Sequence, residues 1–167
     1  PNGEEMRWAN EFRQTLNPYV VVLVPNGSSC TKWWPYSNEL AKRLLLRDDV
    51  SLVVLGDLRD TAFDPHPNLH VIGTTWNVRQ AFTFVQLANV VVGQETGLLN
   101  AVAFERDVRK VVLFTHSSVE NLTRDWPNTA SLREMPECGP CHRLHYNFEF
   151  CNQDPVTKAA KCQAMIS

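Results

Sequence analysis

Two short segments combine the side chains and backbone groups that bind anions. The first is 93–97, a polar turn between a run of three valines and a new apolar run. We interpret this stretch as the end of a buried strand, a tight turn and the start of a helix. Thr96 and Gly97 then offer unpaired backbone N–H groups at the positive end of a helix dipole. In open α/β sheets, ligands bind at this carboxyl edge of the strands.

Glu95 is the unusual residue of this turn, because a carboxylate repels phosphate unless it faces another group. One interpretation is that Glu95 faces a ribose hydroxyl. The alternative is that Glu95 and Thr96 only cap the helix that begins at Gly97. The local sequence leaves both open.

The second segment is the loop 25–35, which contains Ser28, Ser29 and Lys32. Hydroxyls, exposed backbone N–H groups and an ammonium are the parts that a phosphate cradle needs. The loop lacks the GxxxxGK[ST] pattern of a P-loop, and the alternative is an ordinary solvated loop. A further carboxylate, Asp57, follows Gly56 at the end of another apolar run, and it is either a turn former or a hydroxyl-binding group.

Apolar runs alternate with helical patterns along the chain, and this order positions both segments. It predicts an α/β fold with a Rossmann-like, doubly wound parallel sheet. Residues 58–68 and 125–136 have no period and are expected to be irregular. Strands are predicted at Tyr19–Val24, Ser51–Leu55, Leu69–Ile72, Val90–Val92 and Lys110–Phe114, with helices at Glu4–Leu16, after Ser37 or Asn38, at Val78–Ala88 and from Gly97.

The composition is that of an ordinary globular chain. The 167 residues are 44% hydrophobic and carry a formal net charge of −2, from 16 basic and 18 acidic side chains. Without a basic run, a nucleic-acid or anionic-membrane surface is not expected. No apolar stretch reaches the roughly 18 residues of a membrane span. Because the first residue is Pro1 and not methionine, we expect an excised piece of a longer protein.

Three regions are expected along the chain. Residues 1–18 form a leading helix or linker, 19–136 the α/β domain, and 137–167 an irregular and helical tail with a closing helix over 156–166. The tail contains a CxxC pair and two further cysteines, which suit a structural zinc ion although their later spacing is not that of a standard knuckle. Two disulfides or free thiols are the alternatives. The candidate ligands are Cys138, Cys141, Cys151 and Cys162.

Four pieces of the sequence, in order, resemble the glycosyltransferase family that contains the lipopolysaccharide heptosyltransferases. They are the loop 25–35, the strand end 54–57, the turn 73–75 and the segment 92–97. The resemblance covers roughly Tyr19 to Phe114, and it corresponds to the carboxyl-terminal half of the two-domain GT-B fold.

The resemblance implies that this half binds a nucleoside diphosphate sugar, with an ADP-sugar favoured. Lys32, as the residue that acts in catalysis, would stabilise the charge on the leaving diphosphate together with Ser28, Ser29 and the amides of Thr96 and Gly97. Trp76 falls where the family places an apolar side chain against the adenine, so it either stacks on the base or packs under the following helix. No cofactor is expected for the transfer itself.

The resemblance also implies a missing amino-terminal domain that binds the acceptor and supplies the catalytic base. The full-length enzyme would then be cytoplasmic, or peripheral at the inner membrane. Two of the residues that are expected to bind the donor depart from the family pattern: Glu95 stands for an aspartate, and Asn100 for a histidine. Two other functions therefore stay open, a non-catalytic nucleotide or phosphate-binding module and a sugar-nucleotide epimerase of the same fold.

Overall fold

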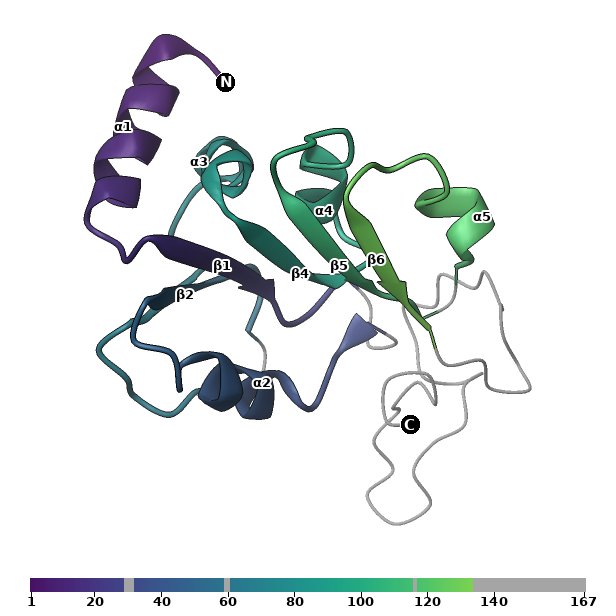
Figure 1. The fold of residues 1–167 in the computed structure, drawn as a ribbon, viewed down its shortest axis with the longest axis horizontal. Helices are drawn as coiled ribbons and strands as arrows, with labels where there is room; N and C mark the ends of the chain where they lie inside the picture. The colour runs from purple at the N-terminus through teal and green to yellow at the C-terminus, as the bar shows by residue number, and fades with distance from the viewer. Residues whose placement is uncertain (29–31, 59–60, 116, 134–167) are drawn as a thin grey trace.

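The computed structural model describes residues 1–28, 32–58, 61–115 and 117–133 (Figure 1). Its strands are β1 (Tyr19–Val24), β2 (Val50–Leu55), β3 (Leu69–Gly73), β4 (Val90–Gln94), β5 (Arg109–Leu113) and β6 (Thr129–Leu132). Its helices are α1 (Gly3–Gln14), α2 (Ser37–Leu44), α3 (Val78–Phe84), α4 (Gly97–Ala101) and α5 (Val119–Leu122), and a 3₁₀ turn, η2 (Val85–Leu87), extends α3.

The strands form one six-stranded sheet in the order β3-β2-β1-β4-β5-β6. Every neighbouring pair is parallel. This confirms the predicted α/β class and the doubly wound parallel sheet. The expectation that 125–136 is irregular was wrong in part, because β6 pairs with β5 from Lys110↔Thr129 onward.

Helices cover both faces of the sheet: α1, α3 and α4 lie on one face, and α2 lies on the other (Figure 1). The valine run of β1 serves both faces because side chains alternate along a strand. Val20, Val22 and Val24 join the core under α1, α3 and α4, whereas Val21 and Leu23 join the core under α2. This double burial explains the continuous apolar run.

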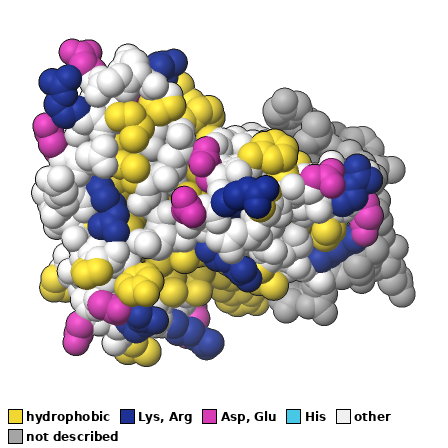
Figure 2. All heavy atoms as spheres, turned by 45° about the horizontal axis from the view of Figure 1, so that its top comes forward, with side chains coloured by type: hydrophobic (Ala, Val, Ile, Leu, Met, Phe, Trp, Pro, Cys, Tyr) yellow, Lys and Arg dark blue, Asp and Glu magenta, His cyan; other side chains and the backbone are white. Residues whose placement is uncertain are grey.

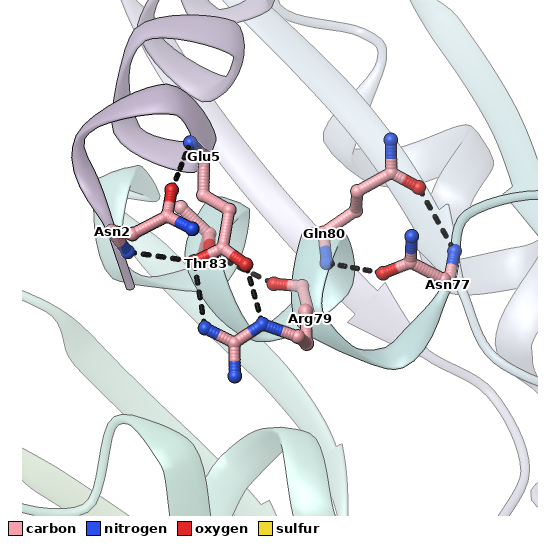
Figure 3. A network of polar contacts seen from close by, with 6 residues as sticks. All are labelled: Asn2, Glu5, Asn77, Arg79, Gln80 and Thr83. Carbon is pink, nitrogen blue, oxygen red and sulfur yellow. Dashed lines mark hydrogen bonds and ion pairs between the residues drawn. The ribbon is translucent and has the colours of Figure 1, made fainter.

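A polar clip joins the first turns of α1 and α3 (Figure 3). Asn2 and Asn77 each cap their helix through a capping box, completed by Glu5 and by Gln80. The Arg79 guanidinium binds both carboxylate oxygens of Glu5, and the Nη2–Oε2 distance is 2.9 Å. The clip therefore fixes α1 on the domain at its amino-terminal end.

Charged side chains of both signs lie on the outer face of the layer formed by α1, α3 and α4 (Figure 2). Figure 2 shows basic and acidic side chains interspersed over it, with apolar side chains between them. A hollow of about 260 Å³ lies beside the clip and is lined in part by Phe82, Thr83 and Ala101. Within the described residues, no helix is long and apolar enough to cross a membrane.

Candidate functional site

The candidate site lies at the carboxyl edge of the sheet, where β1 and β4 are neighbours. After β1 the chain passes to α2 on one face, and after β4 it passes to α4 on the other (Figure 1). The two connections therefore diverge at this point. Such a switch point is where open α/β sheets bind their ligands.

The loop after β1 folds back on itself as a short hairpin. The Gly27 N–H donates to the Lys32 carbonyl over 3.0 Å, and the Trp34 N–H donates to the Pro25 carbonyl over 3.3 Å. The Lys32 stem crosses directly over Gly27, where a β-carbon would lie 2.6 Å from its Cδ atom. Only glycine leaves room for this path. Ser28 is exposed at the hairpin, and Ser29 lies outside the described residues.

Lys32 reaches from this hairpin to the turn after β4, and its side chain is buried, with 8% of the residue exposed. Its Nζ donates to the Glu95 carbonyl over 2.7 Å and lies 4.0 Å from the Glu95 Oε2 atom. Burial lowers the pKa of the Lys32 ammonium below its ordinary 10.5, and the Glu95 carboxylate opposes this by raising it. The two segments singled out in the sequence thus meet in space.

The Glu95 carboxylate contacts the loop after β5. Its Oε1 accepts hydrogen bonds from the backbone N–H groups of Thr115, over 3.2 Å, and Ser117, over 3.1 Å. Its Oε2 accepts from the Thr115 hydroxyl over 3.2 Å. Sequence reasoning missed both partners, although the polar triplet 115–117 follows the strand next to β4. The predicted ribose contact of Glu95 stays a prediction.

The turn after β4 leads into α4, a helix of five residues. Thr96 is its N-cap but makes no capping hydrogen bond with its side chain, and its buried Oγ1 has no hydrogen-bond partner within the described residues. Thr96 thus has the capping position without a capping bond from its side chain, and the Glu95 carboxylate is turned to the loop after β5, so helix capping alone does not account for Glu95. Gly97 and Asn100 are exposed at this helix.

Asn26 joins the β1 hairpin to the loop after β2. Its buried side-chain amide donates to the carbonyls of Asp57, over 3.1 Å, and Leu58, over 2.8 Å, and to the Thr61 hydroxyl. This contact holds the exposed Asp57 beside the hairpin. The one sequence signal for this contact is the position of Asn26, two residues after Val24 ends β1.

Trp76 lies in an aromatic cluster between α1 and the sheet. Its ring is half-buried and stands edge-on to Trp8, Phe12 and Phe84, with centroid distances of 4.8, 5.0 and 5.2 Å. This is the packing alternative of the sequence analysis, since the indole contacts three core rings. Stacking on a base stays a prediction.

The zinc prediction concerns residues outside the described part of the chain, because Cys138, Cys141, Cys151 and Cys162 all fall in 134–167. The closing helix predicted over 156–166 falls there as well. Among the described residues, no group of three or more His, Cys, Asp or Glu side chains could hold a metal ion.

Two solved structures share this fold. The E. coli ADP-heptose lipopolysaccharide heptosyltransferase II matches with a TM-score of 0.70 at 16% sequence identity, over 100% of this chain and 48% of that one. A glycosyl transferase family 9 protein from Veillonella parvula DSM 2008 matches with a TM-score of 0.64 at 14% identity, over 81% of this chain and 42% of that one.

The comparison confirms the heptosyltransferase-like fold that the sequence predicts. The chain spans about half the length of each of these structures. No protein-family model and no curated protein sequence matches the chain.

Proposed function

We propose that this chain is the donor-binding half of a glycosyltransferase, which holds a nucleoside diphosphate sugar while the sugar passes to an acceptor hydroxyl. The observation that carries the proposal is the contact of Lys32 with the turn after β4, at the switch point of the sheet. The fold shared with two glycosyltransferases supports it.

The chemistry of the proposed reaction needs positive charge where the diphosphate leaves. Negative charge grows on the leaving diphosphate as the bond to the sugar breaks, and preorganised cations and N–H groups stabilise it. In this proposal Lys32 supplies the cation, while the exposed Gly97 and Ser28 offer an N–H group and a hydroxyl. Asp57, held beside the hairpin by Asn26, would accept hydrogen bonds from a ribose.

The donor to test first is an ADP-sugar, because the E. coli neighbour is named for ADP-heptose. The acceptor site and the catalytic base belong, in this proposal, to the half of such a structure that this chain does not span. We therefore expect the chain to bind the nucleotide but not to transfer the sugar by itself.

Calorimetric titration with ADP, UDP and GDP tests the proposal. We expect saturable binding with a preference for ADP, and competition by an ADP-sugar for the same site. AMP is the matched control, because it keeps the base and ribose but lacks the second phosphate that Lys32 would meet. Absence of binding to all three diphosphates, or equal affinity for AMP and ADP, would contradict the assignment.

A further inference from the structure

Glu95 lies where three loops of the carboxyl edge meet. Its backbone carbonyl and its Oε2 face the Lys32 ammonium from the β1 hairpin. Its Oε1 holds the backbone of Thr115 and Ser117 from the β5 loop. Both carboxylate oxygens of Glu95 are therefore occupied by hydrogen-bond donors of the protein itself.

The charge of Glu95 matters because Lys32 is buried. Burial disfavours the protonated form of a lysine side chain unless an opposite charge or a hydrogen-bond acceptor compensates for the lost water. Among the charged side chains of the described residues, Glu95 is the one that raises the pKa of Lys32 against the effect of burial. The carboxylate and the ammonium therefore act as a coupled pair.

We propose that Glu95 is a positioning residue: it does not contact the donor but fixes the Lys32 ammonium and the backbone N–H groups of Thr115 and Ser117 as one wall of the diphosphate site. This role rests on the proposed function of that site. It assigns to Glu95 a task different from the ribose contact that the sequence suggested.

The variant Glu95→Gln separates the charge of Glu95 from its hydrogen bonds. A glutamine keeps one oxygen for the two backbone N–H groups, and its Nε2 can donate to the Thr115 hydroxyl. The variant therefore keeps the β5 loop in place and removes only the negative charge beside Lys32. Glu39→Gln, an exposed carboxylate on α2 paired with Arg43, is the matched control.

The first measurement follows the Lys32 ammonium directly, by the pH titration of the ¹³Cε resonance of Lys32. That resonance is identified because it is absent from the spectrum of Lys32→Arg. We expect Lys32 to lose its proton at lower pH in Glu95→Gln than in the wild type and in Glu39→Gln. Thr115→Val removes one hydrogen bond from the carboxylate but leaves its charge, so its Lys32 titration should stay close to that of the wild type.

The second measurement is the affinity for ADP at about pH 7 and about pH 9.5. Between these values we expect the affinity of Glu95→Gln to fall about tenfold more than that of the wild type, since its Lys32 loses the charge earlier. A loss of affinity that is equal at both values would instead mark Glu95 as a ligand contact and overturn the positioning role.

The two proposals fail in different ways. If the wild type binds ADP but Lys32 titrates identically in Glu95→Gln, the positioning role is overturned and the donor site stands. If the wild type binds no nucleoside diphosphate, both the donor site and the positioning role of Glu95 in that site are contradicted.

Discussion

Lys32 and Gly27 lie in direct contact across the β1 hairpin, with the lysine stem occupying the place where any other residue 27 would carry its side chain. A β-carbon there would come within 2.7 Å of the Lys32 Cβ atom and 2.6 Å of its Cδ atom. The position of the ammonium at the switch point thus depends on a residue that has no functional group.

Gly27→Ala should displace Lys32 and weaken ADP binding without removing any charge. Overpacking of this kind costs about 1–3 kcal/mol when neighbours must shift. The measurement is ADP affinity by calorimetry, together with urea unfolding to show that the fold persists. Gly3→Ala is the control, because a β-carbon at Gly3 meets nothing within 4 Å. An unchanged ADP affinity in Gly27→Ala would show that the path of the lysine stem is unimportant.

Lys32→Ala should weaken ADP binding by about 1–3 kcal/mol, as expected for loss of a charge-assisted contact with phosphate. The affinity for AMP should change less, since AMP lacks the second phosphate. Lys42→Ala removes an exposed lysine, paired with Asp64, from α2 and should leave both affinities unchanged. Equal ADP affinities for Lys32→Ala and Lys42→Ala would remove Lys32 from the site.

The clip between α1 and α3 should make the domain sensitive to acid. The Arg79 guanidinium and, after it, the Asn2 backbone N–H hold the pKa of Glu5 at about 2, below its ordinary 4.5. Because the folded state lowers this pKa, the contribution of Glu5 to stability is complete above about pH 4.5 and is lost as the pH falls toward 2.

Urea unfolding of Glu5→Gln as a function of pH tests this contribution. The variant should be less stable than the wild type at neutral pH, and the difference should shrink as the pH falls from 4.5 toward 2. Glu11→Gln, an exposed glutamate on the same helix, serves as the comparison. A difference that stays constant over this range would mean that the ion pair with Arg79 does not stabilise the fold.

The cysteines of 138–162 should bind about one zinc ion per chain if the tetrahedral site predicted from the sequence forms. Elemental analysis of the purified chain measures this directly. Cys138→Ser should lose the zinc, whereas Cys30→Ser, outside the predicted ligand set, should keep it. Zinc-free protein with two disulfides, seen by mass spectrometry under non-reducing conditions, would support the alternative pairing.

The buried strands could be predicted from the sequence because their β-branched runs are long and continuous. β1 and β2 are covered on both faces, and such runs suit few other environments. β6 was missed because its four residues are polar or half-exposed at the edge of the sheet. Only its pairing with β5 makes it a strand.

The meeting of Lys32 with the β4 turn could be anticipated because parallel strands end at one edge of the sheet. The partners of the Glu95 side chain could not be predicted. Glu95 binds Thr115 and Ser117 through contacts 20 and 22 residues apart in sequence, and no local pattern encodes them. The contacts of Trp76 with Trp8 and Phe12 likewise could not be predicted, because they depend on where α1 lies.

The hydrogen bond from Lys32 to the Glu95 carbonyl closes a loop of 63 residues, and it also depends on parallel pairing of β1 with β4. Contacts of such long range form late, since the chain loses conformational entropy before it gains the interaction. Nucleotide capture during refolding would therefore report the completed assembly of the central sheet, and a partly folded chain with β1 unpaired would not yet hold its cation at the sheet edge.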